Sequence, residues 1–303
     1  MSFRRGAALP VSTTLGFAES SDLGPTAGNG FYKRWPDDLA LLADLGVADL
    51  RLTFDWARLQ PKPGEFAGDW VERYENLFAA ADAIGISVWG AMYDSGVPKW
   101  FANEGGIDDD EALTRWWPRW IERVADTFGA HVDGWIPFAV LPDSLPDQVW
   151  IDTWRVLGAG EPPVVASLAA ADGYSFAGRR NGEFDVLGVA LPTHLADDLA
   201  VTDDDLRLAA EHWEQTLNDA AAAAPDEPIM ISSFTPAHID PDVSGRMMER
   251  LVGAIDAAIG DGIDVTTCLV EPAIAGPDAP SALVGSDRTA LPAADAFLIA
   301  PGD

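Results

Sequence analysis

The chain of 303 residues carries 49 Asp and Glu against 19 Lys and Arg, a formal charge of −30. A surface this negative repels phosphate backbones and anionic lipid headgroups, so we expect neither nucleic acid nor membrane as a partner. Apolar residues make up 48% of the chain and include 12 Trp, which is enough for a large core and excludes global disorder. Salt adaptation and the codon bias of a GC-rich genome both remain open as origins of the acidity.

The single cysteine, Cys268, excludes an intramolecular disulfide and any zinc site built from cysteines. The segment Met1–Pro10 has two arginines but no apolar run of signal-peptide length. No segment reaches the roughly 20 consecutive apolar residues of a membrane span. We therefore expect a cytoplasmic protein.

Short apolar or β-branched runs alternate with longer segments of helical period along the chain. Eight runs are predicted as strands: Val11–Phe17, Ala48–Phe54, Ile86–Met92, Gly134–Val140, Pro163–Leu168, Phe184–Ala190, Pro228–Phe234 and Asp264–Val270. The clearest helices predicted between them are Trp70–Ile84, Asp109–Phe128, Thr202–Ala224 and Val243–Gly260. Acidic residues at the starts of the second and third of these helices suit the helix macrodipole, and Thr202 with Asp205 resembles a capping box.

Each predicted helix is followed closely by a strand, which is typical of repeated βα units with parallel strands. Eight such units in a chain of this length predict an α/β fold, a single-domain (β/α)8 TIM barrel with shortened βα loops over residues 1–303. A doubly wound open sheet is the alternative. It would carry a Gly-rich phosphate turn, but the run Gly24–Gly30 lacks the required spacing, and we expect no cofactor.

In a barrel of this kind the chemistry lies where the strands end and the βα loops begin. The predicted strand ends carry several acids: Glu19 after the first strand, Asp55 after the second, Asp94 after the third and Glu271 after the eighth. Arg51 and Tyr93 belong to the second and third strands, His194 follows the sixth, and Ser232 and Ser233 lie in the seventh.

Four stretches of the chain are similar to one known family. Trp35–Arg58 is similar to a second-strand region with its Arg and Trp-x-Arg, and Ile86–Gly106 to a third-strand region with Met-Tyr, Pro and Gly-Gly. Asp126–Trp135 and Leu283–Phe297 are similar to the approach to the fourth strand and to the closing segment. The chain thus resembles the family 1 glycoside hydrolases, the β-glucosidase-like retaining barrels, which implies a TIM barrel.

The resemblance fails at the reacting groups. The family has its acid/base Glu in Thr-x-Asn-Glu-Pro after strand four, where this chain has Ala139 and Val140 at the Asn and Glu positions. The family nucleophile follows strand seven in Thr-Glu-Asn-Gly, and here Ser233 takes the place of that Glu. A retaining hydrolase needs two carboxyl groups about 5–5.5 Å apart, one to attack and one to protonate. The resemblance therefore implies a barrel without the classical retaining activity.

Sugar-binding positions implied by the resemblance differ as well. Asp94 stands at the family's strand-three His, Glu271 at its strand-eight Trp, and Leu23 near its Gln, whereas Arg51 is kept. Asp94 and Glu271, with Glu19, are candidates for relocated catalytic carboxylates, but Asp94 and Glu271 also suit a buried polar network around Arg51. We call the carboxyl end of the barrel, where the strands end and the βα loops begin, the mouth. Binding there is expected to involve Arg51, Tyr93, Asp94, Ser233 and Glu271.

The remaining candidates favour structural roles. His194 lacks a second His or Cys at metal spacing, so we expect a loop residue and no metal site. Trp116, Trp117 and Trp120 have helical spacing, and at least two of them are expected in the core rather than on a carbohydrate platform.

Three functions remain open on these observations. The leading one is a family-like barrel that binds a sugar-like molecule or a protein partner at the mouth, where the family has its active site. The second is a repurposed glycoside hydrolase or another acid/base enzyme that uses Asp94, Glu271 or Glu19. The third is a structural or assembly subunit, which predicts a large apolar patch on one face.

Overall fold

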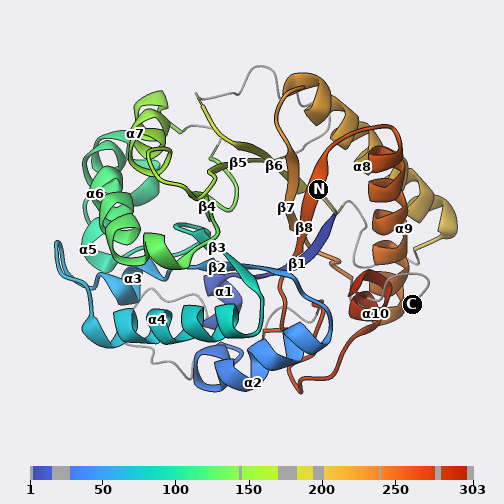
Figure 1. The fold of residues 1–303 in the computed structure, drawn as a ribbon, viewed down its shortest axis with the longest axis horizontal. Coiled ribbons are helices and arrows are strands. Elements are labelled where there is room, and N and C mark those ends of the chain that lie inside the picture. Colours follow the sequence, from blue (N-terminus) through green and yellow to red (C-terminus); the bar gives the residue numbers. More distant parts are fainter. Residues whose placement is uncertain are drawn as a thin grey trace.

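The computed structural model describes residues 3–15, 28–142, 145–169, 183–193, 201–238, 240–276 and 281–298. Within these residues eight parallel strands form a nearly closed barrel with the order β4-β3-β2-β1-β8-β7-β6-β5 (Figure 1). The strands are β1 (Arg4–Leu9), β2 (Asp49–Thr53), β3 (Ser87–Ala91), β4 (Gly134–Ile136), β5 (Val165–Ala169), β6 (Val186–Leu191), β7 (Ile229–Phe234) and β8 (Val265–Val270). A single parallel bridge between Trp135 and Val164 joins the two end strands, β4 and β5.

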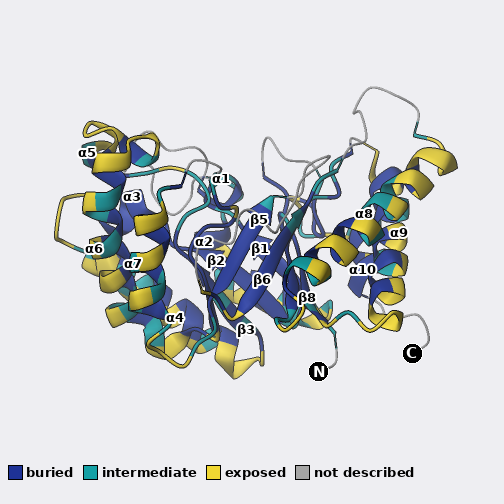
Figure 2. Cartoon of the chain, turned by 90° about the horizontal axis from the view of Figure 1, so that it is seen from above, coloured by how far each residue is buried: buried dark blue, intermediate teal, exposed yellow. Residues whose placement is uncertain are grey.

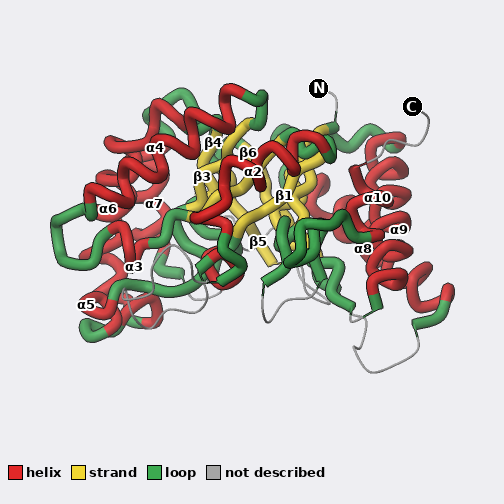
Figure 3. The backbone as a smooth tube through the Cα atoms, turned by 90° about the horizontal axis from the view of Figure 1, so that it is seen from below, coloured by secondary structure: helices red, strands yellow, loops and turns green. Residues whose placement is uncertain are grey.

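Helices surround the strands, with α4, α6 and α7 on one flank and α8, α9 and α10 on the other (Figure 3). Their bounds are α1 (Val11–Thr14), α2 (Phe31–Asp44), α3 (Trp56–Leu59), α4 (Gly68–Ala83), α5 (Lys99–Ala102), α6 (Asp110–Phe128), α7 (Asp147–Leu157), α8 (Asp203–Ala223), α9 (Pro241–Gly260) and α10 (Pro292–Leu298). Short 3-10 turns cover Gly106–Asp108 and Gly129–His131. All four helices named from the sequence are confirmed, and Thr202 and Asp205 form the capping box of α8.

The predicted first strand is wrong. Val11–Thr14 forms the short helix α1, and the strand is Arg4–Leu9 instead; residues 16 and 17 lie outside the described part. The β-branched run after Pro10 imitates a strand, but the hydroxyls of Thr13 and Thr14 donate to the Pro10 carbonyl at 3.1 and 3.0 Å. Such local bonds favour a turn over a sheet ladder. The other seven predicted strands overlap the observed ones.

The barrel interior holds a small apolar cluster, and a much larger core lies between the sheet and the helices. The interior cluster consists of Ala91, Ile136, Val165, Val186, Met230 and Leu269, with Trp89 packed against it. Gly134 makes room for Trp89, because a Cβ at this position would overlap the indole ring. Figure 2 shows the strands dark with burial and the exposed residues on the outer faces of the helices.

Aromatic side chains dominate the core around α6. Trp117 and Trp120 are 0% and 1% exposed, and Trp120 stacks on Trp56 with ring centroids 4.9 Å apart. Trp116 lies at the edge of this core, where its indole nitrogen donates to Glu104 at 2.6 Å. The expected core role for at least two of the three α6 tryptophans is confirmed.

The start of α3 contains a buried ion pair. Asp55 is the N-cap residue and accepts a hydrogen bond from the Arg58 backbone N–H at 2.9 Å. The same carboxylate pairs with the Arg58 guanidinium, and both side chains are almost fully buried. Asp55 therefore has a structural role directly after β2, next to the barrel mouth.

Candidate functional site

Arg51 and Glu271 form an ion pair at the carboxyl end of the barrel. The Arg51 side chain comes from β2, is 1% exposed, and contacts Glu271, which directly follows β8 and is 20% exposed. Its Nη1 also donates to the Ser232 carbonyl in β7 at 2.7 Å. Since β1 separates β2 from β8, the guanidinium reaches across the barrel interior, as the hypothesis of a buried network expected.

Two serines of β7 extend this network in both directions. The Ser233 hydroxyl donates to the Glu271 carboxylate, so both oxygens of that carboxylate are engaged. The Ser232 hydroxyl lies 2.6 Å from the Ser167 hydroxyl in β5, and Ser167 donates to the Ala139 carbonyl at 2.5 Å. A chain of polar contacts thus runs from β2 through β8 and β7 to β5 and the segment after β4.

A bulge in β7 allows two consecutive serines to take part. The pairing register of β7 shifts against β6 between Val189 and Ala190, and against β8 between Ile231 and Phe234. In a regular strand Ser232 and Ser233 would point to opposite faces of the sheet. Bulges re-aim side chains and are frequent beside functional sites.

Asp94 lies just after β3 and supports the start of α1. Its Oδ2 accepts a hydrogen bond from the Val11 backbone N–H at 2.9 Å, and its Oδ1 accepts one from the Ser95 hydroxyl at 2.8 Å. Burial raises the pKa of Asp94 above its ordinary value of 3.8, although these bonds and the nearby Arg51 charge favour the ionised form. Burial also raises the pKa of Tyr93, with the negative charge of Asp94 adding to the effect.

The structure therefore brings Arg51, Ser233 and Glu271 into direct contact, and it places Asp94 within electrostatic reach of Arg51. Among the hydrogen bonds of the described residues, none joins Asp94 to Arg51 or to Glu271. Val140 follows β4 and is 38% exposed. Glu19, Leu23 and His194, which the sequence also singled out, lie outside the described residues.

Sequence reasoning missed the part played by Ser167. This residue sits within the apolar run of β5, is fully buried, and links Ser232 to the segment after β4. Its alternation with Val165, which belongs to the interior cluster, was the available signal, because residues two apart in a strand share a face.

No group of three or more His, Cys, Asp or Glu suited to a metal ion occurs among the described residues. Likewise, none of the helices in this part of the chain is long and apolar enough to cross a bilayer. The cytoplasmic location stays a prediction.

A family model described as glycosyl hydrolase family 1 matches residues 18–141. This part of the chain is similar to the family 1 glycosyl hydrolases. The predicted resemblance and the predicted barrel are both confirmed. The match includes β2, β3 and β4 but ends before β7. The substitutions at both catalytic positions, Val140 and Ser233, remain predictions from the sequence.

Curated β-glucosidases are similar to parts of this family 1-like chain. "Beta-glucosidase A" of Thermotoga maritima is 25% identical over 126 residues, which is 41% of this chain and 28% of the relative. A "Beta-glucosidase" of Agrobacterium sp. is 26% identical over 202 residues, 62% of this chain and 42% of the relative. The chain thus spans less than half the length of these curated relatives.

Solved structures share the fold of the family 1-like barrel. A structure titled "Apo structure of a beta-glucosidase 1317" gives a TM-score of 0.76 at 19% identity, covering 98% of this chain and 97% of that one. The family 1 β-glucosidase from Thermotoga maritima gives 0.76 at 13% identity, covering 97% and 95%. At these identities the likeness concerns the barrel alone.

Proposed function

We propose that this family 1-like barrel binds a neutral sugar-like ligand at its mouth and does not carry out retaining glycoside hydrolysis. One observation carries the proposal: the hydroxyl of Ser233, at the position that the resemblance assigns to the nucleophile, donates its hydrogen bond to Glu271. Val140, at the position that the resemblance assigns to the acid/base residue, has no group that transfers a proton. The two carboxyl groups that retention requires are therefore absent from these two positions.

The charge balance of the mouth supports a neutral, hydroxyl-rich ligand. The charges of Arg51 and Glu271 compensate each other, and burial raises the pKa of Asp94 above its ordinary value. Ser233, Tyr93 and Asp94 add groups that donate or accept hydrogen bonds. A protein partner is the other occupant to consider, but relationship to a carbohydrate-active family favours the sugar.

A repurposed acid/base enzyme is the second candidate, and a specific contrast favours it. Burial raises the pKa of Asp94, whereas Glu271 is paired with the Arg51 guanidinium. Two carboxyl groups whose environments differ in this way suit an acid and a base. If they act as a pair in inverting hydrolysis, their separation must leave room for a water, about 6.5–9.5 Å.

The test combines turnover and binding. Chromogenic aryl glycosides are assayed with the wild type, Asp94→Asn and Glu271→Gln, and glucose and galactose are titrated calorimetrically. We expect no turnover in any sample, and sugar binding that Glu271→Gln weakens but Asp256→Asn, an exposed change on α9, leaves intact. Turnover that Asp94→Asn or Glu271→Gln abolishes would replace this proposal with the repurposed enzyme. Absence of sugar binding together with a stable oligomer would favour an assembly subunit.

A further inference from the structure

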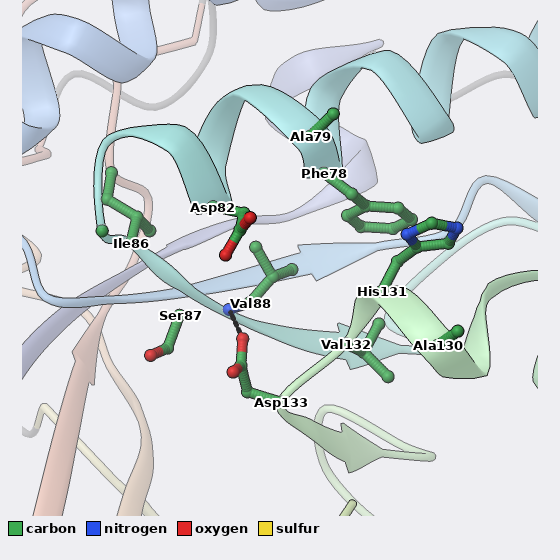
Figure 4. A pocket seen from close by; sticks show the side chains of 11 residues that line it. Phe78, Ala79, Asp82, Ile86, Ser87, Val88, Ala130, His131, Val132 and Asp133 are labelled. Carbon is green, nitrogen blue, oxygen red and sulfur yellow. Dashed lines mark hydrogen bonds between the residues drawn. The ribbon is translucent and has the colours of Figure 1, made fainter.

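A cavity lies at the opposite end of the barrel from Glu271. It has a volume of about 410 Å³ and lies between the end of α4, the start of β3 and the 3-10 turn that precedes β4 (Figure 4). Its lining residues are Phe78, Ala79, Asp82, Gly85, Ile86, Ser87, Val88, Ala130, His131, Val132 and Asp133. Small-molecule pockets commonly measure roughly 300–1,000 Å³, so this cavity is large enough for a small ligand.

Two carboxylates face this cavity from opposite walls. Figure 4 shows Asp82 on α4 and Asp133 before β4 directed into the space between the helix and the strands. Asp133 uses Oδ2 to accept the Val88 backbone N–H at 2.7 Å, which fixes its side chain and leaves Oδ1 available to a ligand. Among the described residues, none forms a hydrogen bond or an ion pair with the Asp82 side chain.

The nearest cation offsets these acids only in part. Arg4 donates to the Ser87 hydroxyl at 2.9 Å, on the cavity wall, and is attracted to Asp133 as well, but its guanidinium pairs directly with Asp49 at 2.6 Å, so one cation faces three carboxylates. The cavity also lies beside the C-terminal ends of α4 and α6, where the helix macrodipole is negative. Asp82 lies in the last turn of α4. The negative end of the helix dipole and the Asp82 carboxylate therefore both disfavour an anion in the cavity.

An aromatic pair supplies the apolar part of the wall. The rings of Phe78 and His131 are nearly parallel, at 10°, with centroids 6.1 Å apart. Phe78 is buried, whereas His131 is exposed at the rim of the cavity. Carbon atoms of a ligand can pack beside these rings while a cationic group meets the carboxylates, and aromatic faces also attract cations.

We propose that this cavity binds a small organic cation, a primary ammonium or guanidinium compound, between Asp82 and Asp133. A dehydrated metal ion fits less well, because the described residues here do not gather three ligating side chains. The site is separate from the mouth, because β3 runs between them and the four residue steps from Ser87 to Ala91 alone span about 13 Å.

The experiment follows backbone amide shifts in the full chain while 1,4-diaminobutane is added. Methylguanidinium is a second cationic probe, and 1,4-butanediol and Mg²⁺ are the neutral and metal comparisons. We expect saturable shifts confined to residues 78–88 and 130–133 with both organic cations. Asp82→Asn should weaken binding about tenfold, since a hydrogen bond to a charged group is lost. Asp256→Asn, which changes another exposed acid on α9, should leave it unchanged.

Three outcomes would overturn the proposal. Shifts spread over the whole acidic surface would indicate screening of the −30 charge rather than a site. Equal binding by 1,4-butanediol would remove the role of the carboxylates, and tighter binding of Mg²⁺ at the same residues would assign the cavity to a metal. If Asp82→Asn unfolds the chain, Asp82→Glu serves instead, and it must retain saturable binding.

Discussion

Replacing Glu271 with Gln should destabilise the protein because it leaves the buried Arg51 guanidinium without a counter-charge. Arg51 is 1% exposed, and after this change its remaining described partner is the Ser232 carbonyl. Removing one member of a fully buried pair costs about 3–5 kcal/mol. Glu271 is 20% exposed, so water already screens part of the pair, and the new amide still accepts one hydrogen bond. We therefore expect a loss of about 2–3 kcal/mol.

The reverse change provides the comparison. Arg51→Met removes the buried cation, and water can hydrate Glu271 at its exposed edge, so the expected loss is smaller, about 1–2 kcal/mol. Once Arg51 is gone, Glu271→Gln should cost almost nothing more. The double-mutant cycle then gives a coupling energy of about 2 kcal/mol.

Urea unfolding followed by tryptophan fluorescence measures all four proteins, with unchanged m-values required for the comparison. If Glu271→Gln costs the same with and without Arg51, the two residues do not depend on each other. The reasoning from their contact would then be refuted, and with it the interpretation of the mouth as one connected network.

Three further predictions concern other parts of the barrel. Because the folded-state pKa of Asp94 is raised above 3.8, the folded protein binds more protons there, and stability falls as pH rises from about 4 through the raised value. Asp94→Asn should therefore gain stability relative to wild type over that pH range in unfolding titrations. Asp55→Ala removes a helix cap and one member of a buried ion pair, so it should lower the free energy of unfolding by about 3–5 kcal/mol. The exposed N-cap change Asp240→Ala should lower it by about 1 kcal/mol. Equal losses for the two variants in urea unfolding would contradict this reasoning. Gly134→Ala should lower the free energy of unfolding by about 1–3 kcal/mol, because the new methyl group overlaps the Trp89 ring. Gly129→Ala, whose new Cβ has its nearest contact at 3.8 Å, should leave stability almost unchanged. Thermal denaturation measures both variants.

The sequence predicted most of the barrel because its strands and helices are locally consistent. The acidic start of α6 and the Thr202–Asp205 box of α8 are short-range signals, and both occur where expected. β1 was missed because its two arginines and Gly6 obscure the pattern. The glycine is required there, since a Cβ would lie 2.7 Å from the Asp49 carbonyl, a contact that only the assembled barrel creates.

The site was less predictable because its contacts depend on register. That Arg51 and Glu271 meet follows from strand order in a closed barrel, so the pairing could be anticipated. No periodic pattern in the sequence marks the bulge that turns both Ser232 and Ser233 toward polar partners. The bond from Val11 to Asp94 was hidden for another reason, because it forms only when residue 11 begins a helix rather than a strand.

The connected mouth network bears directly on the choice between a binding protein and an enzyme. A carboxylate that attacks or takes a proton must have an oxygen free to approach the substrate, and Glu271 has one oxygen on Arg51 and the other on Ser233. Such a group is well placed to orient a ligand through Ser233 and poorly placed to approach a reacting atom. Ser233→Ala would free one of these oxygens. If the barrel is a binding protein, that change should weaken sugar affinity without creating turnover. If Glu271 is a base that the serine restrains, the same change should raise the rate on aryl glycosides, and a measured increase would decide for the enzyme.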